Sequence, residues 1–156
     1  MVYEIEVKDL PDRYVASIRL TTTPDKLGEA FREVLPEVDA EILEAGSRPA
    51  GPPFALYHAY HEDSVDLEAG FPLEEPVATS GRVIGRELQA TFAAVAWHHG
   101  SYDGIGAAHR AVEAWMQAKG KEASGPPWEV YWTGPRDDPD SASWVTEVGY
   151  PFRGDP

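Results

Sequence analysis

Glu129 is the first candidate functional residue, because it lies among large aromatic and apolar side chains in the stretch Gly125-Pro-Pro-Trp-Glu-Val-Tyr-Trp132. Read as a strand, the stretch alternates, so Glu129 and Tyr131 share one face. The other face carries Trp128 and Trp132, which we expect to pack beneath helices. A carboxylate on an apolar wall needs a hydrogen bond or a cation. Glu129 is therefore a candidate partner for a cationic ligand or a candidate acid-base group; a hydrogen-bonded structural glutamate is the alternative.

The composition narrows the classes of partner. Thirteen basic and 27 acidic side chains give the 156 residues a net charge of -14, which disfavours nucleic acid and anionic membrane surfaces and attracts cationic small molecules. The absence of cysteine excludes thiol catalysis and thiolate metal sites. No run of about 18 apolar residues is present, and the charged, alternating stretch 1–12 does not resemble a signal peptide. We therefore expect a cytoplasmic protein.

The elements that must position Glu129 follow from periodicity and turn residues. Amphipathic spacing predicts two helices, over about 23–46 and 101–120, and Pro36 is expected to kink or split the first. Alternating or continuous apolar runs predict seven strands, over about 3–8, 14–20, 54–60, 65–71, 87–98, 128–132 and 143–150. Trp115 and Met116 lie on the stripe of the second helix and are expected in the core.

The two halves of the chain repeat each other. Gly51-Pro-Pro-Phe-Ala-Leu-Tyr57 parallels Gly125-Pro-Pro-Trp-Glu-Val-Tyr131, and Glu68-Ala-Gly-Phe-Pro72 parallels Glu147-Val-Gly-Tyr-Pro151. This repeat predicts an α+β fold made of two strand-helix-strand-strand units, with pseudo-twofold symmetry, an antiparallel sheet that forms a central groove, and helices on the other face. We expect one domain over 1–156, with repeat 1 at about 1–79 and repeat 2 at about 80–156. In this alignment Ala55 answers to Glu129, which makes Glu129 an unmatched carboxylate.

Other constellations are explained more simply. His58 and His61 resemble metal ligands but lie at a turn and lack a closed set of four, so we expect no metal site. His99, Ser101 and Asp103 are too close in sequence to converge as a triad. No motif for a cofactor is present, and no cofactor is expected.

In the order and spacing of several short segments, the chain resembles the GyrI-like small-molecule-binding family, which is also the effector-binding half of certain bacterial transcription regulators. The segments are Glu6-Val-Lys-Asp-Leu-Pro11, Glu68-Ala-Gly-Phe-Pro72, His99-Gly-Ser-Tyr102 ahead of a helix with Trp115, Trp128-Glu-Val-Tyr131 and Thr146-Glu-Val-Gly-Tyr-Pro151. The resemblance implies a groove for flat, lipophilic, often cationic molecules, with Glu129 as the charge partner and aromatic rings stacking on the ligand. Glu147 matches the family's second glutamate and is expected to face Glu129 across the hairpin. The expected ligand-binding residues are Glu129, Tyr131, Glu147, Tyr57, Trp97, His99 and Tyr102.

Three functions remain open at this point. The first is a stand-alone binding protein for lipophilic, cationic aromatic compounds, as a xenobiotic sensor or a sequestering protein. The second, which the resemblance implies through a further branch of the family, is a hydrolase of cyclopropanoid compounds, with Glu129 as general acid-base and Tyr131 assisting. The third is an interaction protein like the gyrase inhibitors of the namesake branch, for which a protein partner is expected.

Overall fold

The computed structural model describes residues 2–156 and divides into two compact units. Unit 1 contains the described residues up to Pro11 together with Ala90–Pro156, and unit 2 contains Asp12–Gln89. The first strand, β1 (Glu6–Leu10), belongs to unit 1 because it pairs with a strand of the second half of the chain.

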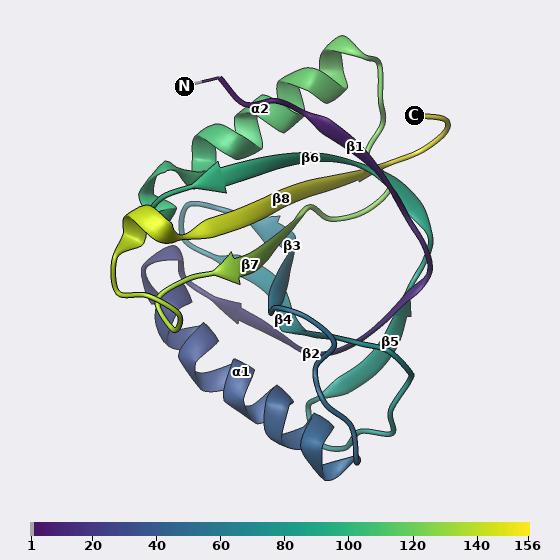
Figure 1. Cartoon of the computed structure of the whole chain (residues 1–156), viewed down its shortest axis with the longest axis vertical. Coiled ribbons are helices and arrows are strands. Elements are labelled where there is room, and N and C mark those ends of the chain that lie inside the picture. The colour runs from purple at the N-terminus through teal and green to yellow at the C-terminus, as the bar shows by residue number, and fades with distance from the viewer. Residues whose placement is uncertain (1) are drawn as a thin grey trace. The chain divides into compact units, whose positions relative to one another are not determined.

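Unit 2 is a four-stranded antiparallel sheet with one helix. Its strands stand in the order β3 (Phe54–Tyr60), β4 (Val65–Leu73), β2 (Arg13–Thr22) and β5 (Ile84–Leu88). A 3-10 turn at Pro24–Lys26 leads into helix α1 (Leu27–Glu44), which lies against β2 and β4 (Figure 1). The helix is continuous through Pro36, so the predicted split is wrong. Pro36 is exposed, and water can bond the carbonyl that it leaves without a partner.

Unit 1 has the same construction. Its strands stand in the order β1, β6 (Thr91–His99), β8 (Val145–Phe152) and β7 (Trp128–Thr133), all antiparallel. A 3-10 turn at Tyr102–Gly104 precedes helix α2 (Ile105–Ala118), which lies along β6 and β8 (Figure 1), and another turn, Ser141–Ser143, precedes β8. The α+β class and the duplicated strand-helix-strand-strand units are confirmed.

One predicted strand is two strands in the structure. The apolar run expected as a single strand over 87–98 is divided into β5 and β6, with a break at Gln89 and Ala90. β5 pairs with β2 inside unit 2, whereas β6 pairs with β1 and β8 inside unit 1. The break is thus where the chain returns to unit 1, after entering unit 2 at Asp12.

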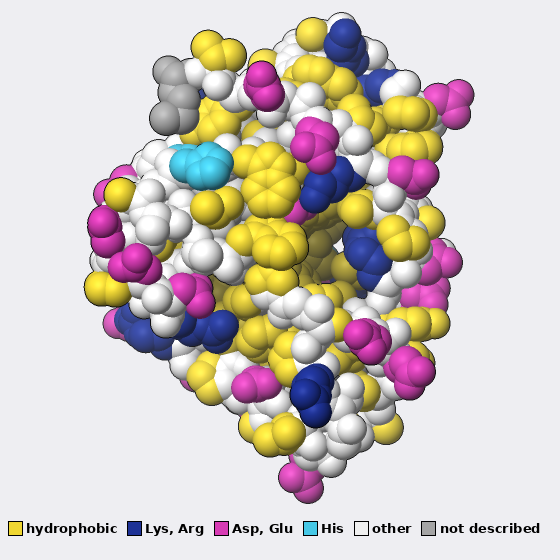
Figure 2. Space-filling view, viewed as in Figure 1, with side chains coloured by type: hydrophobic (Ala, Val, Ile, Leu, Met, Phe, Trp, Pro, Cys, Tyr) yellow, Lys and Arg dark blue, Asp and Glu magenta, His cyan; other side chains and the backbone are white. Residues whose placement is uncertain are grey.

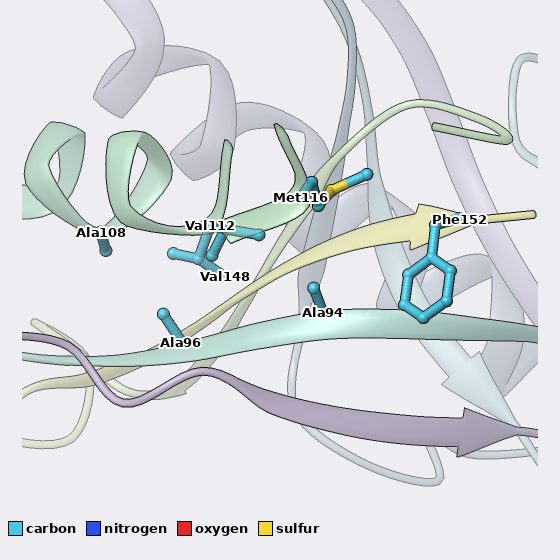
Figure 3. Close-up of a cluster of buried hydrophobic side chains, with 7 residues drawn as sticks. All are labelled: Ala94, Ala96, Ala108, Val112, Met116, Val148 and Phe152. Atoms are coloured by element: carbon cyan, nitrogen blue, oxygen red, sulfur yellow. The ribbon is translucent and has the colours of Figure 1, made fainter. Parts of the chain in front are cut away.

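The core of unit 1 is formed between α2 and the pair β6–β8. Its buried side chains are Ala94, Ala96, Ala108, Val112, Met116, Val148 and Phe152 (Figure 3). The small alanine side chains of β6 allow the helix to pack close to the strand. Each fully buried valine side chain stabilises the folded state by about 1.5–3 kcal/mol. Trp115 packs against this cluster and its ring lies 6.2 Å from that of Phe152, which confirms its predicted place in the core.

The two units share details of strand register as well as their order of elements. Ala55 stands opposite Ala69 in the β3–β4 pair, and Glu129 stands opposite Val148 in the β7–β8 pair. In both pairs the register shifts two residues later, immediately after Tyr57 and after Tyr131. Positions in one unit can therefore be matched to positions in the other from the backbone pairing itself.

The acidic side chains do not form one continuous patch on the face shown in Figure 2. Asp and Glu side chains are scattered there among other residues. Within residues 2–156, no helix combines the length and the apolar character that a membrane span requires.

Candidate functional site

Glu129 is buried on the helix side of the unit 1 sheet. Only 7% of the residue is exposed, and it stands opposite Val148, a member of the core beneath α2. Its Oε1 accepts a hydrogen bond from the Tyr131 hydroxyl at 2.6 Å, and its Oε2 lies 2.7 Å from Nε2 of His109 on α2. The carboxylate is thus held between a strand residue and a helix residue.

The predicted packing of the tryptophans is wrong, because Trp128 and Trp132 lie on the face away from α2. Trp128 stands opposite Gly149 and its indole covers it so closely that any side chain at this position would collide with the ring. Trp132 donates from Nε1 to Glu147 at 3.1 Å. Strand alternation correctly separated these residues from Glu129, but alternation cannot tell which face a helix will cover.

A chain of hydrogen bonds continues from Glu129 to the surface of α2. Nδ1 of His109 lies 2.8 Å from the Tyr150 hydroxyl, which donates to Oε1 of Glu113 at 3.0 Å. Glu113 is exposed, so the chain joins a buried carboxylate to the surface. Burial, the negative charge of Glu113 and the hydrogen bond to it raise the pKa of Tyr150 far above its ordinary value, so this hydroxyl keeps its proton.

Sequence reasoning missed His109, Tyr150 and Glu113. One signal was available: His109 directly follows Ala108 on the buried stripe of the helix, where a polar residue needs a hydrogen-bonding partner. The partner could not be predicted, because it required knowing that α2 covers the face of β7 that carries Glu129.

Aromatic side chains adjoin Glu129 on the same side of unit 1. The ring of Tyr102 meets that of Tyr131 edge-on at 5.8 Å and lies 4.9 Å from that of Trp144. Burial, followed by the negative charges of Glu129 and Asp137, raises the pKa of Tyr102. A carboxylate beside such rings offers a cation both a counter-charge and π faces.

Glu147 does not face Glu129, contrary to expectation. It stands opposite Val130 in the β7–β8 pair, and neighbouring strand positions point to opposite faces of the sheet. Its Oε1 accepts from Nζ of Lys8 at 3.2 Å, and the same ammonium lies 4.9 Å from the centre of the Trp97 ring. Trp97 and Glu147 therefore belong to a second cluster, on the face away from α2, in which a lysine of the chain already supplies the positive charge.

The remaining predicted ligand residues are His99 and Tyr57. His99 is exposed at the end of β6. Tyr57 belongs to unit 2, where its ring lies 6.1 Å from that of Tyr60. Among residues 2–156 no group of three or more His, Asp or Glu side chains is placed to hold a metal ion; His58 instead lies 3.0 Å from Glu68.

Unit 2 holds its own buried carboxylate, Glu68, at the position matched to Glu147. Glu68 is 4% exposed and accepts two hydrogen bonds from Arg86 at 2.8 Å and one from Ser17 at 2.6 Å. Burial raises the pKa of Glu68, but the hydrogen bonds from Arg86, Ser17 and His58 outweigh it and leave the pKa below its ordinary value. Arg86 of β5 stands opposite Val15, and Lys8 of β1 stands opposite Ala93; these are matched positions in the outermost strands of the two units. The glutamate-cation pair is thus present in both repeats.

The hydrogen-bonded chain of Glu129 is present in one repeat only. Strand pairing matches Glu129 with Ala55 and Tyr150 with Phe71. Superposing the buried stripe of Ala30, Val34 and Val38 on that of Ala108, Val112 and Met116 matches His109 with Phe31 and Glu113 with Leu35. Four polar residues of unit 1 therefore answer to four apolar residues of unit 2.

Comparison with known proteins agrees with this architecture. The model of the GyrI-like small molecule binding domain matches residues 3–153. The crystal structure of the EcmrR C-terminal domain is 25% identical, with a TM-score of 0.86 over 99% of this chain and 100% of that one. The structure of SAV2435 bound to tetraphenylphosphonium is 14% identical, with a TM-score of 0.67 over 97% of this chain and 94% of that one.

EcmrR in its complex with DNA also matches, at 25% identity and a TM-score of 0.87 over 99% of this chain. The present chain spans 59% of the EcmrR chain in that complex. No curated protein matches the chain.

Proposed function

Because the chain belongs to the GyrI-like small-molecule-binding domain family, we propose that it binds lipophilic aromatic cations, with Glu129 as the partner of their positive charge. The observation that carries the proposal is the unmatched carboxylate: the repeat places Ala55 where unit 1 has Glu129. A buried carboxylate costs stability, and a fold that manages without it in one half does not need it in the other.

The immediate surroundings of Glu129 suit such a ligand. Tyr131 and Tyr102 present rings next to the carboxylate, and a cation over a ring gains about 0.5–2 kcal/mol. A carboxylate that is 10% exposed attracts a cation more strongly than one in bulk water, because the surrounding medium screens its charge less. SAV2435, which shares the fold, is bound to tetraphenylphosphonium, and this supports the choice of a lipophilic cation as the probe.

A titration with a planar cationic dye, followed through tryptophan fluorescence, tests the proposal. Glu129→Gln keeps the shape and removes the charge, so we expect dye affinity to fall by about 1 kcal/mol or more, which is roughly fivefold or greater. Glu147→Gln is the matched control, because it removes a buried carboxylate of the same sheet from the opposite face and should leave dye affinity unchanged. Equal affinity of wild type and Glu129→Gln would remove the proposed role of Glu129.

A second candidate function is hydrolysis of an electrophilic cyclopropanoid compound. The observation that favours it is the contact of 2.6 Å between Tyr131 and Glu129, which joins a carboxylate to a hydroxyl in a largely water-excluded place. In such a reaction Glu129 acts as general acid-base and Tyr131 positions water or substrate. Chromatography after incubation with a cyclopropane-bearing alkylator tests it: ring-opened product that depends on Glu129 supports an enzyme, and full recovery of the compound supports binding alone.

A further inference from the structure

The hydrogen bonds around His109 require a particular count of protons. A tyrosine hydroxyl has one hydrogen, and an ionised carboxylate can only accept. The Tyr150 hydroxyl donates that hydrogen to Glu113, so the contact of 2.8 Å between Tyr150 and Nδ1 of His109 is a hydrogen bond only if Nδ1 carries a proton. The high pKa of Tyr150 excludes the alternative of a tyrosinate.

The other ring nitrogen of His109 is subject to the same reasoning. Nε2 lies 2.7 Å from Oε2 of Glu129, which must accept, and Oε1 of Glu129 already accepts from Tyr131. Both ring nitrogens of His109 must therefore donate if all the hydrogen bonds from Tyr131 to Glu113 are to form. An imidazole ring with two N–H groups is an imidazolium.

The groups that face His109 favour this charged form. Glu129 of β7 and Tyr150 of β8 contact the two ring nitrogens directly. Behind them, Tyr131 of β7 bonds to Glu129 and Glu113 of α2 bonds to Tyr150, so a second hydroxyl and a second carboxylate lie one hydrogen bond further away. The His109 side chain is 19% exposed, and a partly buried positive charge beside carboxylates is stabilised by them.

We propose that His109 is an imidazolium in the free protein, where it is the internal counter-cation of Glu129, and that an aromatic cation bound at Glu129 takes over this role with release of one proton. The inference rests on the proposed function and names His109 as the residue that sets its specificity. The Nδ1 proton passes to the Tyr150 oxygen while the hydroxyl hydrogen of Tyr150 leaves through Glu113 to water. Neutral His109 then accepts from Tyr150, and the ligand's charge replaces the one that was lost.

Two consequences follow for ligand choice. The site selects compounds that carry a positive charge, such as phosphonium or quaternary ammonium ions, because a neutral compound cannot replace the imidazolium. Protons compete with the ligand, so cation affinity rises with pH until His109 of the free protein is already neutral.

Calorimetric titration of the whole chain with tetraphenylphosphonium, in two buffers of different ionisation enthalpy, counts the protons released. We expect close to one proton per bound cation at about pH 6 and fewer at about pH 8. Glu113→Gln supplies an amide that can donate to Tyr150, which frees the hydroxyl hydrogen for Nδ1 and lets neutral His109 satisfy every contact. In this variant proton release should fall well below one and affinity at the lower pH should rise.

The outcomes separate the inference from the proposed function. Saturable binding without proton release overturns the role of His109 and leaves the binding function standing, and so does equal release by wild type and His109→Phe. Absence of any binding contradicts the proposed function instead. The nitrogen chemical shifts of His109 in the free protein test the protonation itself without a ligand: two protonated nitrogens support it, and one unprotonated nitrogen overturns it.

Discussion

Unit 1 and unit 2 are two versions of one structural unit, and they differ in polarity where α1 and α2 meet the strands. In unit 2 this place is filled by Phe31, Leu35, Ala55 and Phe71, and in unit 1 by His109, Glu113, Glu129 and Tyr150. Unit 2 therefore shows that the fold is complete without these hydrogen-bonded polar residues. On the opposite face both units keep a glutamate paired with a basic residue, Glu68 with Arg86 and Glu147 with Lys8.

The comparison separates two kinds of buried carboxylate. A feature that both repeats keep has an explanation in the fold they share, so we assign Glu68 and Glu147 to structure. A feature that one repeat has and the other lacks needs another explanation, because burying a charge without need lowers stability. This is the reason to assign Glu129 and His109 to function.

The largest expected effect comes from moving the carboxylate into the unit that lacks its partners. Ala55 is fully buried, and Ala55→Glu should lower the free energy of unfolding by about 3–5 kcal/mol, because the new charge has no histidine at the position of Phe31. Urea unfolding measures this. Ala55→Gln controls for size, and the extra cost of Glu over Gln should shrink as the pH falls toward 4, since burial raises the pKa of such a carboxyl and the neutral form is cheaper to bury. A loss below about 1 kcal/mol for Ala55→Glu would show that unit 2 accepts a carboxylate and would break the comparison.

The second largest effect on the free energy of unfolding is expected from breaking the pair Glu68–Arg86, compared with the pair Glu147–Lys8. Arg86→Met removes a two-pronged partner from Glu68 and should cost about 2 kcal/mol, reduced from the value for a fully buried pair because Arg86 is 39% exposed and Ser17 and His58 remain. Lys8→Met removes one contact of 3.2 Å with Glu147 and the cation–π contact with Trp97, and should cost about 1 kcal/mol or less. Thermal and urea unfolding of the two variants side by side give the ranking, and the reverse order would mean that the two pairs are not equivalent parts of the repeat.

The smallest effect on stability is expected from making unit 1 resemble unit 2. The combined variant His109→Phe, Glu129→Ala and Tyr150→Phe removes the imidazole, the buried carboxylate and the Tyr150 hydroxyl together, so that of these hydrogen bonds only the one donated by Tyr131 loses its acceptor, and stability should change by less than about 2 kcal/mol. Urea unfolding checks the stability, and dye titration should show that cation binding is lost. A variant that unfolds would instead show that the polar chain supports the fold of unit 1.

Much of this could be predicted from the sequence, and the exceptions have physical causes. The repeated Gly-Pro-Pro segments revealed the duplication, and strand alternation put Glu129 on the face opposite Trp128. Strand alternation separates the two faces of a sheet but does not tell which face a helix covers. The prediction that the tryptophans pack beneath the helices was therefore wrong. The pairing of Lys8 with Glu147 was beyond reach for a different reason: it joins residues 139 apart in sequence through the pairing of β1 with β6.

His109 shows the limit most clearly. Its position on a helix stripe was visible, but its role depends on its partners Glu129 of β7 and Tyr150 of β8, and on Glu113 of its own helix, which accepts from Tyr150. The same repeat that identified Glu129 would have identified His109, had the two helices been matched residue by residue, because Phe31 stands in its place.

The most direct test of the central claim is a comparison of two probes of the same shape and opposite charge. Tetraphenylphosphonium and tetraphenylborate should be titrated calorimetrically into the wild type and into Glu129→Gln at the same ionic strength. The overall negative charge favours the cation in both proteins, so the change in the ratio of the two affinities is the measurement. We expect Glu129→Gln to lower the preference for the cation by about tenfold, equivalent to about 1.4 kcal/mol. A ratio that is the same in both proteins would contradict the assignment of Glu129 as the charge partner of the ligand.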